Sequence, residues 1–257
     1  MTNLKVTAIQ TNLFWEDISA NLKQLEKQLA TLANSTDIII LPEMFSTGFS
    51  MTPAKFAEKP DGKTLKWLKK QAQKTNAVIT GSYIVKEAGN YFNRLIWMQP
   101  DGVFQAYNKR HLFSLSDEPK HYTAGQEKLI VDYKGWKICP LICYDLRFPI
   151  WSRNVENYDL LIYVANWPEK RAHHWRSLLM ARAIENQSYT VGVNRVGNDG
   201  NDYYHSGDTS LIDFAGNILL HTAHVEGVHT LTLDYQKQQT FRKRFQFLAD
   251  KASFELH

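Results

Sequence analysis

The sequence predicts an α/β fold, because segments typical of strands alternate with segments in which apolar residues recur at helical spacing. The first unit consists of an alternating strand over 4–9, an amphipathic helix over 18–32 and a short apolar strand over 37–41. The chain contains no Gly-x-Gly-x-x-Gly fingerprint, so a dinucleotide-binding fold of the Rossmann type is not expected. There is no internal repeat or linker, and one domain is the simplest interpretation of 257 residues.

The rest of the chain continues this alternation. The pair Asp101-Gly102 is a turn signal and predicts a hairpin between the strand-like segments on either side of it. A stretch rich in glycine and asparagine over 197–202 predicts a loop. The other expected elements, in chain order, are a helix around 65–72, strands over 77–85, 91–98, 103–107, 128–133 and 136–142, a helix over 150–156, a strand over 160–165, a helix over 172–186, and strands over 189–194, 209–214, 218–221 and 230–233.

The composition is that of an ordinary globular protein, with 44% hydrophobic, 12% aromatic and 22% charged residues. The 30 basic and 26 acidic residues are dispersed along the chain, which argues against a nucleic-acid partner. No apolar run approaches the ~18 residues of a membrane span, and residues 1–10 lack the features of a signal peptide. We therefore expect a cytoplasmic protein with no membrane partner. The nine histidines show no metal-binding spacing, so no metal site is expected.

Three side chains with reactive groups, Glu43, Lys109 and Cys143, each follow a predicted strand. Active sites of α/β proteins collect at the carboxyl ends of strands. Taken singly, Cys143 is more typical of a small buried hydrophobe, Glu43 of an exposed charge and Lys109 of a solvated basic cluster. Taken together, they provide what amide hydrolysis requires, which is a nucleophile, a carboxylate base and a cation for the developing oxyanion.

The second cysteine, Cys139, lies four residues before Cys143 in the same strand-like run. Four residues of a strand extend over about 13 Å, which is beyond the reach of a disulfide. No motif surrounds Cys139, so we interpret it as buried packing without chemistry.

The three reactive residues lie in segments that resemble the motifs of the nitrilase superfamily, whose members use a Glu-Lys-Cys triad. The similar segments are Leu41-Pro-Glu43, Asn108-Lys-Arg-His-Leu112, Leu141-Ile-Cys-Tyr-Asp-Leu-Arg-Phe-Pro149, Ala165-Asn-Trp-Pro168 and Ala181-Arg-Ala-Ile-Glu-Asn-Gln187. Their order and spacing agree with the family, and the resemblance spans residues 5–233. It implies a four-layer α-β-β-α sandwich of the nitrilase type. It also implies a single carbon–nitrogen hydrolase domain over 1–257, with a C-terminal extension from about 235.

Within the superfamily, the chain most resembles the bacterial omega-amidase branch. This resemblance implies hydrolysis of the terminal amide of small 2-oxo dicarboxylic monoamides, such as 2-oxoglutaramate and 2-oxosuccinamate, through a cysteine thioester and without a cofactor. Cys143 is followed by Tyr144-Asp145, whereas the nitrile-hydrolysing branch typically has Trp-Glu there. The alternatives are an N-carbamoyl hydrolase, a nitrilase acting on another small substrate, and a non-catalytic binding protein. The complete triad argues against the last of these.

The resemblance also implies supporting roles for residues near the triad. Glu118 takes the place of a second glutamate that orients the lysine and the substrate, and a surface loop carboxylate is the alternative. The backbone N–H of Tyr144 is expected to bind the carbonyl oxygen together with Lys109, and Trp167 to line the acyl pocket unless it belongs to the core. Lys109 is also expected to favour the thiolate of Cys143, because a nearby cation lowers a thiol's pKa.

The sequence does not identify the residue that binds a substrate carboxylate. Arg147, Arg171 and Arg195 are candidates by charge alone, because arginine suits bidentate carboxylate recognition. Members of the superfamily form dimers through the helices that follow the cysteine, here predicted over 150–156 and 172–186. We therefore expect a homodimer, although burial in the monomer core explains the same apolar helix face.

Overall fold

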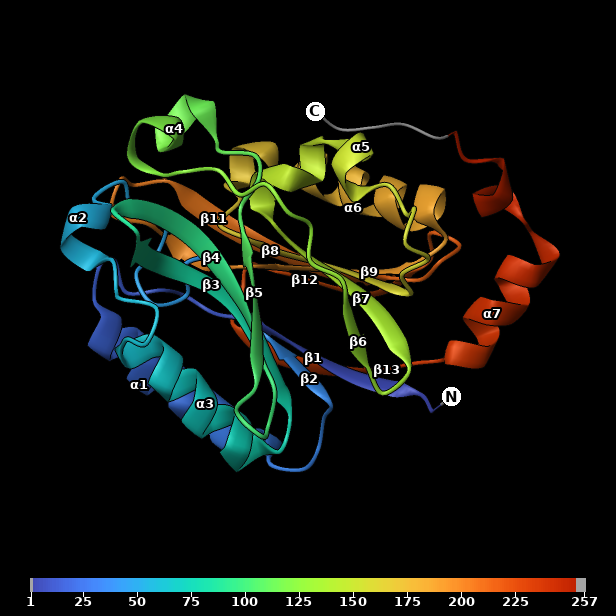
Figure 1. Cartoon of the computed structure of the whole chain (residues 1–257), viewed down its shortest axis with the longest axis horizontal. Coiled ribbons are helices and arrows are strands. Elements are labelled where there is room, and N and C mark those ends of the chain that lie inside the picture. The colour runs from blue at the N-terminus through green and yellow to red at the C-terminus, as the bar shows by residue number, and fades with distance from the viewer. Residues whose placement is uncertain (1, 253–257) are drawn as a thin grey trace.

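The computed structural model describes residues 2–252, which form two β-sheets packed face to face (Figure 1). In spatial order, the first sheet contains β13 (Gly227–Leu233), β1 (Leu4–Gln10), β2 (Ile38–Ile40), β3 (Val78–Glu87), β4 (Asn90–Met98) and β5 (Phe104–Asn108). The second sheet contains β10 (Val196–Asn198), β11 (Tyr204–Ile212), β9 (Tyr189–Asn194), β8 (Leu160–Ala165), β7 (Trp136–Ile142) and β6 (Val131–Tyr133), with β12 (Ile218–Ala223) also paired to β11.

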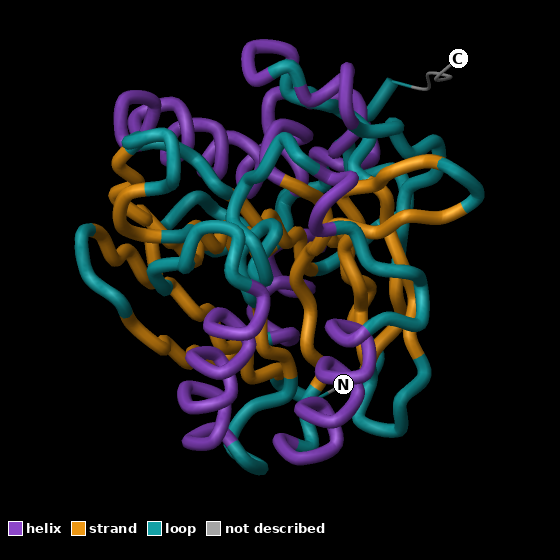
Figure 2. The backbone as a smooth tube through the Cα atoms, turned by 90° about the vertical axis from the view of Figure 1, so that its left-hand side faces the viewer, coloured by secondary structure: helices purple, strands orange, loops and turns teal. Residues whose placement is uncertain are grey.

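Helices cover the outer face of each sheet, so the molecule has four layers (Figure 1). The helices α1 (Ile18–Leu29) and α3 (Lys63–Thr75) lie against the first sheet, and α5 (Pro149–Ser152) and α6 (Ala172–Asn186) lie against the second. The strands lie between helices in the perpendicular view as well (Figure 2). The remaining short or peripheral elements are η1 (Ala30–Leu32), α2 (Pro53–Phe56), η2 (Ser114–Ser116), α4 (Glu118–His121), η3 (Cys143–Arg147), η4 (Glu169–Arg171), α7 (Tyr235–Arg244) and η5 (Phe247–Asp250).

The three isoleucines of β2 pack into two different clusters, one on each face of the first sheet. Ile38 and Ile40 belong to the large buried cluster that joins the two sheets, whereas Ile39 belongs to the cluster beneath α1 and α3. Successive side chains of a strand point to opposite faces. A strand that is covered on both sides therefore has an uninterrupted run of apolar residues in its sequence. The four-layer α-β-β-α sandwich expected from the family resemblance is therefore confirmed.

Two local expectations differ from the structure, and one helix near the C-terminus was not predicted. The helix expected over 150–156 ends at Ser152, because Arg153 adopts an extended backbone conformation with ψ 132°. Part of the loop expected over 197–202 is strand β10, whose backbone pairs with β11. The C-terminal segment contains α7, which begins where the side chain of Asp234 accepts a hydrogen bond from the backbone N–H of Lys237.

Although strongly polar, α7 is attached to the second sheet by hydrogen bonds. The side chain of Gln238, which is fully buried, donates to the backbone oxygen of Asp159 at 2.8 Å. Arg242 forms an ion pair with the Asp159 carboxylate, also at 2.8 Å. Within residues 2–252, no helix is both long enough and apolar enough to cross a membrane.

Candidate active site

The sheet topology brings the predicted reactive residues to one edge of the sandwich. Strands β2 and β3 are parallel, and β4 is antiparallel to both β3 and β5, so β2 and β5 end at the same edge of the first sheet. Glu43 follows β2 and Lys109 directly follows β5. In the second sheet β7 and β8 are parallel, and Cys143 and Asn166 follow their carboxyl ends.

The Glu43 carboxylate is fully buried and held by three donors. Its Oε1 accepts hydrogen bonds from Asn93 Nδ2 at 2.8 Å and from Lys109 Nζ at 2.9 Å. Its Oε2 accepts the backbone N–H of Asn166 at 2.8 Å, and the Asn166 side-chain amide also donates to the Glu43 backbone oxygen at 2.6 Å. These contacts fix the orientation of the carboxylate.

Lys109 and Glu118 form a buried ion pair beside Glu43. Lys109 Nζ lies 3.1 and 2.9 Å from the two carboxylate oxygens of Glu118, and the backbone N–H of Phe113 donates to Glu118 Oε2 at 2.6 Å. Glu118 is fully buried, so the alternative of a surface loop carboxylate is wrong. Burial by itself would lower the pKa of Lys109, but the charges of Glu118 and Glu43 outweigh it and raise that pKa. The lysine therefore stays protonated.

Cys143 is the first residue of η3 and has a left-handed backbone conformation, with φ 44°. Its side chain is only 8% exposed. Burial raises the pKa of the Cys143 thiol well above its usual value, the charge of Glu43 raises it further, and a hydrogen bond to Glu43 adds to the rise. Lys109 lowers the pKa, as expected from the sequence, but does not outweigh the other effects. The resting side chain is a thiol next to a carboxylate.

A third buried carboxylate, Asp145, connects the cysteine turn to the lysine segment. Its Oδ2 accepts hydrogen bonds from Tyr107 Oη at 2.7 Å and from the backbone N–H of Ile142 at 3.0 Å. Its Oδ1 accepts the backbone N–H of His111 at 3.0 Å and lies 2.8 Å from the His111 ring nitrogen Nδ1. Because one side chain ties both segments, Cys143 and Lys109 are held in a fixed relation across the two sheets.

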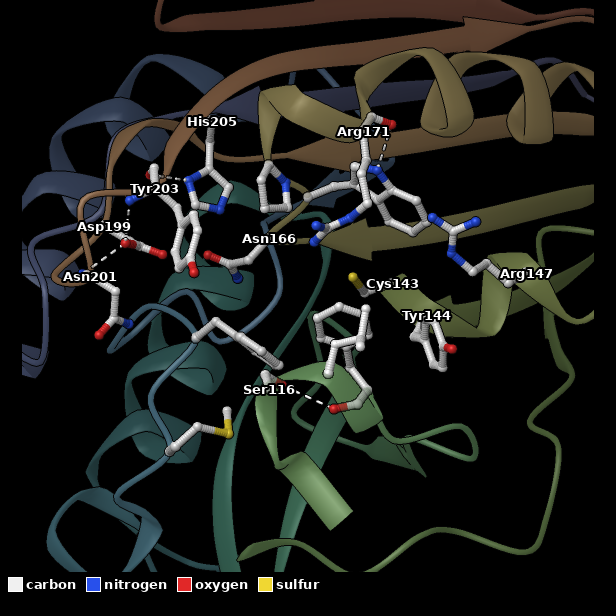
Figure 3. A pocket seen from close by; sticks show the side chains of 16 residues that line it. Ser116, Cys143, Tyr144, Arg147, Asn166, Arg171, Asp199, Asn201, Tyr203 and His205 are labelled. Carbon is white, nitrogen blue, oxygen red and sulfur yellow. Dashed lines mark hydrogen bonds between the residues drawn. The ribbon is translucent and has the colours of Figure 1, made fainter. Parts of the chain in front are cut away.

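Cys143 opens onto a cavity of about 370 Å³ (Figure 3). Figure 3 shows its sulfur directed toward the cavity. Tyr144 and Trp167, both expected near the substrate, line this cavity. Trp167 is also buried, and its Nε1 donates to the backbone oxygen of Arg171 at 2.8 Å. The full lining is Phe49, Met51, Phe113, Leu115, Ser116, Cys143, Tyr144, Arg147, Asn166, Trp167, Pro168, Arg171, Asp199, Asn201, Tyr203 and His205.

Two of the three candidate arginines, Arg147 and Arg171, line the cavity, but Arg195 does not. Arg195 is fully buried, and its guanidinium donates to Asn12 Oδ1 and to the backbone oxygen of Asn198, both at 2.7 Å. It therefore supports the backbone. Among residues 2–252, no group of three or more His, Cys, Asp or Glu side chains is arranged to hold a metal ion.

Sequence reasoning missed the two asparagines that hold Glu43. Asn166 lies in the Ala-Asn-Trp-Pro segment. The resemblance of this segment to the family is the signal that could have identified Asn166 together with Trp167. Asn93 lies within β4, in the run Asn90–Met98, and no local motif distinguishes it from an ordinary strand residue. Its contact with Glu43 depends on the pairing of β3 with β4, which local pattern does not specify.

The fold and the site together define a class of hydrolase in which a buried cysteine lies beside a carboxylate and an ammonium group. Residues 5–243 match the carbon–nitrogen hydrolase family. The chain belongs to this family, and it is therefore a hydrolase of carbon–nitrogen bonds.

Individual relatives agree with this assignment. The chain is 43% identical to omega-amidase YafV of Yersinia enterocolitica over 260 residues, which covers 100% of both chains. It is 31% identical to 2-oxoglutaramate amidase of Bacillus subtilis over 243 residues, or 93% of each chain. The structure of XC1258 from Xanthomonas campestris, a CN-hydrolase superfamily protein with an arsenic adduct in its active site, has a TM-score of 0.98 and 42% identity over 100% of both chains.

Proposed function

We propose that this protein hydrolyses the terminal amide of short 2-oxo dicarboxylic monoamides, such as 2-oxoglutaramate and 2-oxosuccinamate, to the acid and ammonia. The observation that supports the chemistry best is the buried contact of Lys109 with Glu43 and Glu118 beside the Cys143 thiol. The similarity to an omega-amidase over the full length, and to a 2-oxoglutaramate amidase over 93% of each chain, supports the substrate class.

In the first half of the reaction, Cys143 Sγ attacks the amide carbon while Glu43 takes the thiol proton. A base beside the thiol suits the raised thiol pKa, because a preformed thiolate is scarce. The carbonyl oxygen gains negative charge and is stabilised by the Lys109 ammonium and by the backbone N–H of Tyr144. Tyr144 lies in the first turn of η3, where amides have no partner inside the helix. Glu43 then gives its proton to the departing nitrogen, so that ammonia leaves and a thioester remains.

In the second half, water hydrolyses the thioester at the same position. Glu43, again a carboxylate, takes a proton from the attacking water as oxygen adds to the thioester carbon. The carbon–sulfur bond breaks, the sulfur regains a proton from Glu43, and the carboxylic acid is released. Glu118 contributes by holding Lys109 in position and keeping it charged, since its carboxylate contacts the ammonium. No step of this sequence requires a cofactor.

The cavity dimensions and lining agree with a short substrate. Phe113, Tyr144 and Trp167 provide aromatic walls, and Arg147 and Arg171 provide positive charge for a carboxylate. A cavity of about 370 Å³ that is lined in this way favours a compact anion over a polymer or a long aliphatic chain.

Ammonia release across a panel of amides tests the proposal directly. We expect 2-oxoglutaramate and 2-oxosuccinamate to be cleaved with higher kcat/KM than glutamine, asparagine and simple aliphatic amides, because a remote carboxylate supplies binding energy that orients the amide. Equal rates across the panel would contradict the substrate assignment. Release of carbon dioxide together with ammonia would identify an N-carbamoyl hydrolase instead, and turnover of nitriles alone would identify a nitrilase.

We also propose that the protein is cytoplasmic and acts as a homodimer. Both cysteines are free thiols, which is typical of a reducing compartment. Light scattering after size-exclusion chromatography measures the mass in solution. A mass equal to that of one 29.7 kDa chain would contradict the dimer.

A further inference from the structure

We infer that Arg171 binds the carboxylate at the far end of the substrate and thereby selects 2-oxo dicarboxylic monoamides over neutral amides. This inference rests on the proposed function, which it extends by assigning one residue to substrate selection. Arg171 ends η4, immediately before α6, and its half-buried side chain lines the same cavity as Cys143.

The charges that line the cavity are separated. Figure 3 shows the guanidinium groups of Arg147 and Arg171 on the side where Cys143 and Tyr144 lie, and Asp199 on the opposite side. Asp199 is fixed there, because its Oδ1 accepts the backbone N–H groups of Asn201 at 2.8 Å and Tyr203 at 3.0 Å. A substrate carboxylate is repelled by Asp199 and attracted to the arginines, so it is drawn to the arginine side of the cavity.

The backbone of Arg171 is held firmly. Its N–H donates to the Pro168 oxygen at 3.0 Å, and its carbonyl oxygen accepts the indole N–H of Trp167 at 2.8 Å. The guanidinium carbon lies 5.3 Å from the centre of the Phe113 ring. These contacts fix the backbone from which the side chain extends and give its guanidinium one aromatic neighbour, which reduces the entropy lost on binding.

The N–H donors of the Arg171 guanidinium are available to a ligand. Within residues 2–252, none of its N–H groups donates to a protein acceptor and no ion pair neutralises it. A guanidinium has five N–H donors in a planar arrangement that matches a carboxylate bidentately. A half-buried group of this kind, inside the cavity of the nucleophile, is suited to an anionic ligand.

Arg147 is the alternative, and its contacts differ. Its guanidinium lies over the Trp167 ring at 4.8 Å, and one of its nitrogens lies 3.1 Å from His174 Nδ1. Arg147 also lines a second, shallower hollow with His173 and His174 outside the cavity of Cys143. Part of the hydrogen-bonding capacity of Arg147 is already used within the protein. Arg147 therefore contributes positive charge, while Arg171 contacts the substrate carboxylate directly.

The test compares two substrates that differ only at the far end. In 4-oxopentanamide a methyl group replaces the carboxylate of 2-oxoglutaramate, while the ketone and the amide are retained. Arg171→Ala should lower kcat/KM for 2-oxoglutaramate by about 30- to 100-fold, on the order of one lost charge-assisted hydrogen-bonded pair. It should change kcat/KM for 4-oxopentanamide by less than about threefold. Arg171→Lys should recover part of the loss, and Arg147→Ala should cause a selective loss of under about tenfold.

A binding measurement gives a readout that does not depend on turnover. Glutarate, a dicarboxylate without an amide, should protect Cys143 of the wild-type protein from alkylation by iodoacetamide. This protection should weaken at least about tenfold in Arg171→Ala, because the anion loses its charged partner. The melting temperature of each variant verifies folding, and Arg171→Lys replaces Arg171→Ala if the latter is unstable.

The outcomes separate this inference from the proposed function. If the wild-type protein cleaves both substrates equally well, the proposed function itself is wrong. If the wild type prefers 2-oxoglutaramate but Arg171→Ala keeps that preference and its glutarate protection, the assignment of Arg171 is wrong. Equal losses on both substrates, or a larger selective loss in Arg147→Ala, would also overturn it.

Discussion

Cys139 and Cys143 lie four residues apart, and comparing them shows which features of the site are specific to chemistry. Cys139 is inside β7, fully buried in the core cluster that joins the sheets, and is opposite Leu161 of β8. Cys143 lies just beyond β7, in η3, where the chain leaves the sheet and its side chain reaches the cavity. Burial raises the pKa of both thiols.

The two thiols therefore differ in their partners rather than in the direction of their pKa shifts. The charges that act on the pKa of Cys139 come from Lys128, Glu156 and Asp145, and Cys139 does not line the cavity that Cys143 reaches. Cys143 lies close enough to Glu43 and Lys109 for the carboxylate to raise the pKa of its thiol and for the ammonium to lower it. A buried thiol becomes a nucleophile when a base can remove its proton during attack and a fixed cation can bind the developing oxyanion.

From the comparison of the two cysteines, we expect Cys143→Ala to have the largest effect on turnover. Removal of the sulfur eliminates the proposed covalent intermediate, so turnover should fall by about 10⁴-fold or more. Ammonia release under saturating 2-oxoglutaramate measures the loss, and glutarate binding by calorimetry verifies that the cavity is intact. If Cys143→Ala retained most of the wild-type rate, the mechanism would have to proceed without a thioester.

Glu43→Gln should have the next largest effect. Glutamine keeps the size of the side chain and its hydrogen bond to Lys109 but is not a base, so both acylation and thioester hydrolysis should slow by about 100-fold or more. Single-turnover kinetics distinguishes the two steps, and an unchanged rate in both would mean that Glu43 does not transfer protons.

The same variant should have the opposite effect on thiol alkylation. Glu43 raises the pKa of Cys143 through its charge and its hydrogen bond, whereas Lys109 lowers it. Without the Glu43 charge the pKa of the thiol falls, so more thiolate is present between pH 7 and 8. Iodoacetamide should then label Cys143 about 3- to 10-fold faster in Glu43→Gln than in the wild type, with the wild-type rate rising as pH increases. Slower labelling in the variant would mean that Glu43 acts as a base in alkylation also.

Much of the secondary structure was predictable because the local pattern is strong. The strands over 160–165 and 189–194 and the helix over 172–186 begin and end at the predicted residues. The polar helix α7 gives no such pattern, because Gln238 is its only buried residue. The layering was predicted only from the family resemblance, and the sheet order was not predicted, because both depend on contacts between distant segments that local periodicity does not encode.

The residues of the site also divide into those that a local motif predicts and those that only the folded structure identifies. Glu43, Lys109 and Cys143 were predictable because each follows a strand and belongs to a motif. The hydrogen bond from Asn93 to Glu43 joins residues 50 positions apart, and the contact between Tyr107 and Asp145 joins residues 38 positions apart. Such contacts depend on how the strands assemble, so the residues that orient the reactive groups become visible only in the folded chain.

Cys139→Ala should produce the smallest effect and sharpens the comparison most directly. Cys139 is packed in the core without a polar partner, so loss of its sulfur should reduce the free energy of unfolding by about 1 kcal/mol. For a chain of this size that corresponds to a decrease in Tm of roughly 2–4 °C, measurable by calorimetry. The kcat should stay within about twofold of the wild type, because Cys139 takes no part in the hydrogen bonds that hold Glu43 and Lys109. Thiol labelling of the folded variant should match that of the wild type, since the sulfur that reaches the cavity is that of Cys143. If labelling disappeared in Cys139→Ala and persisted in Cys143→Ala, the roles assigned to the two cysteines would be reversed.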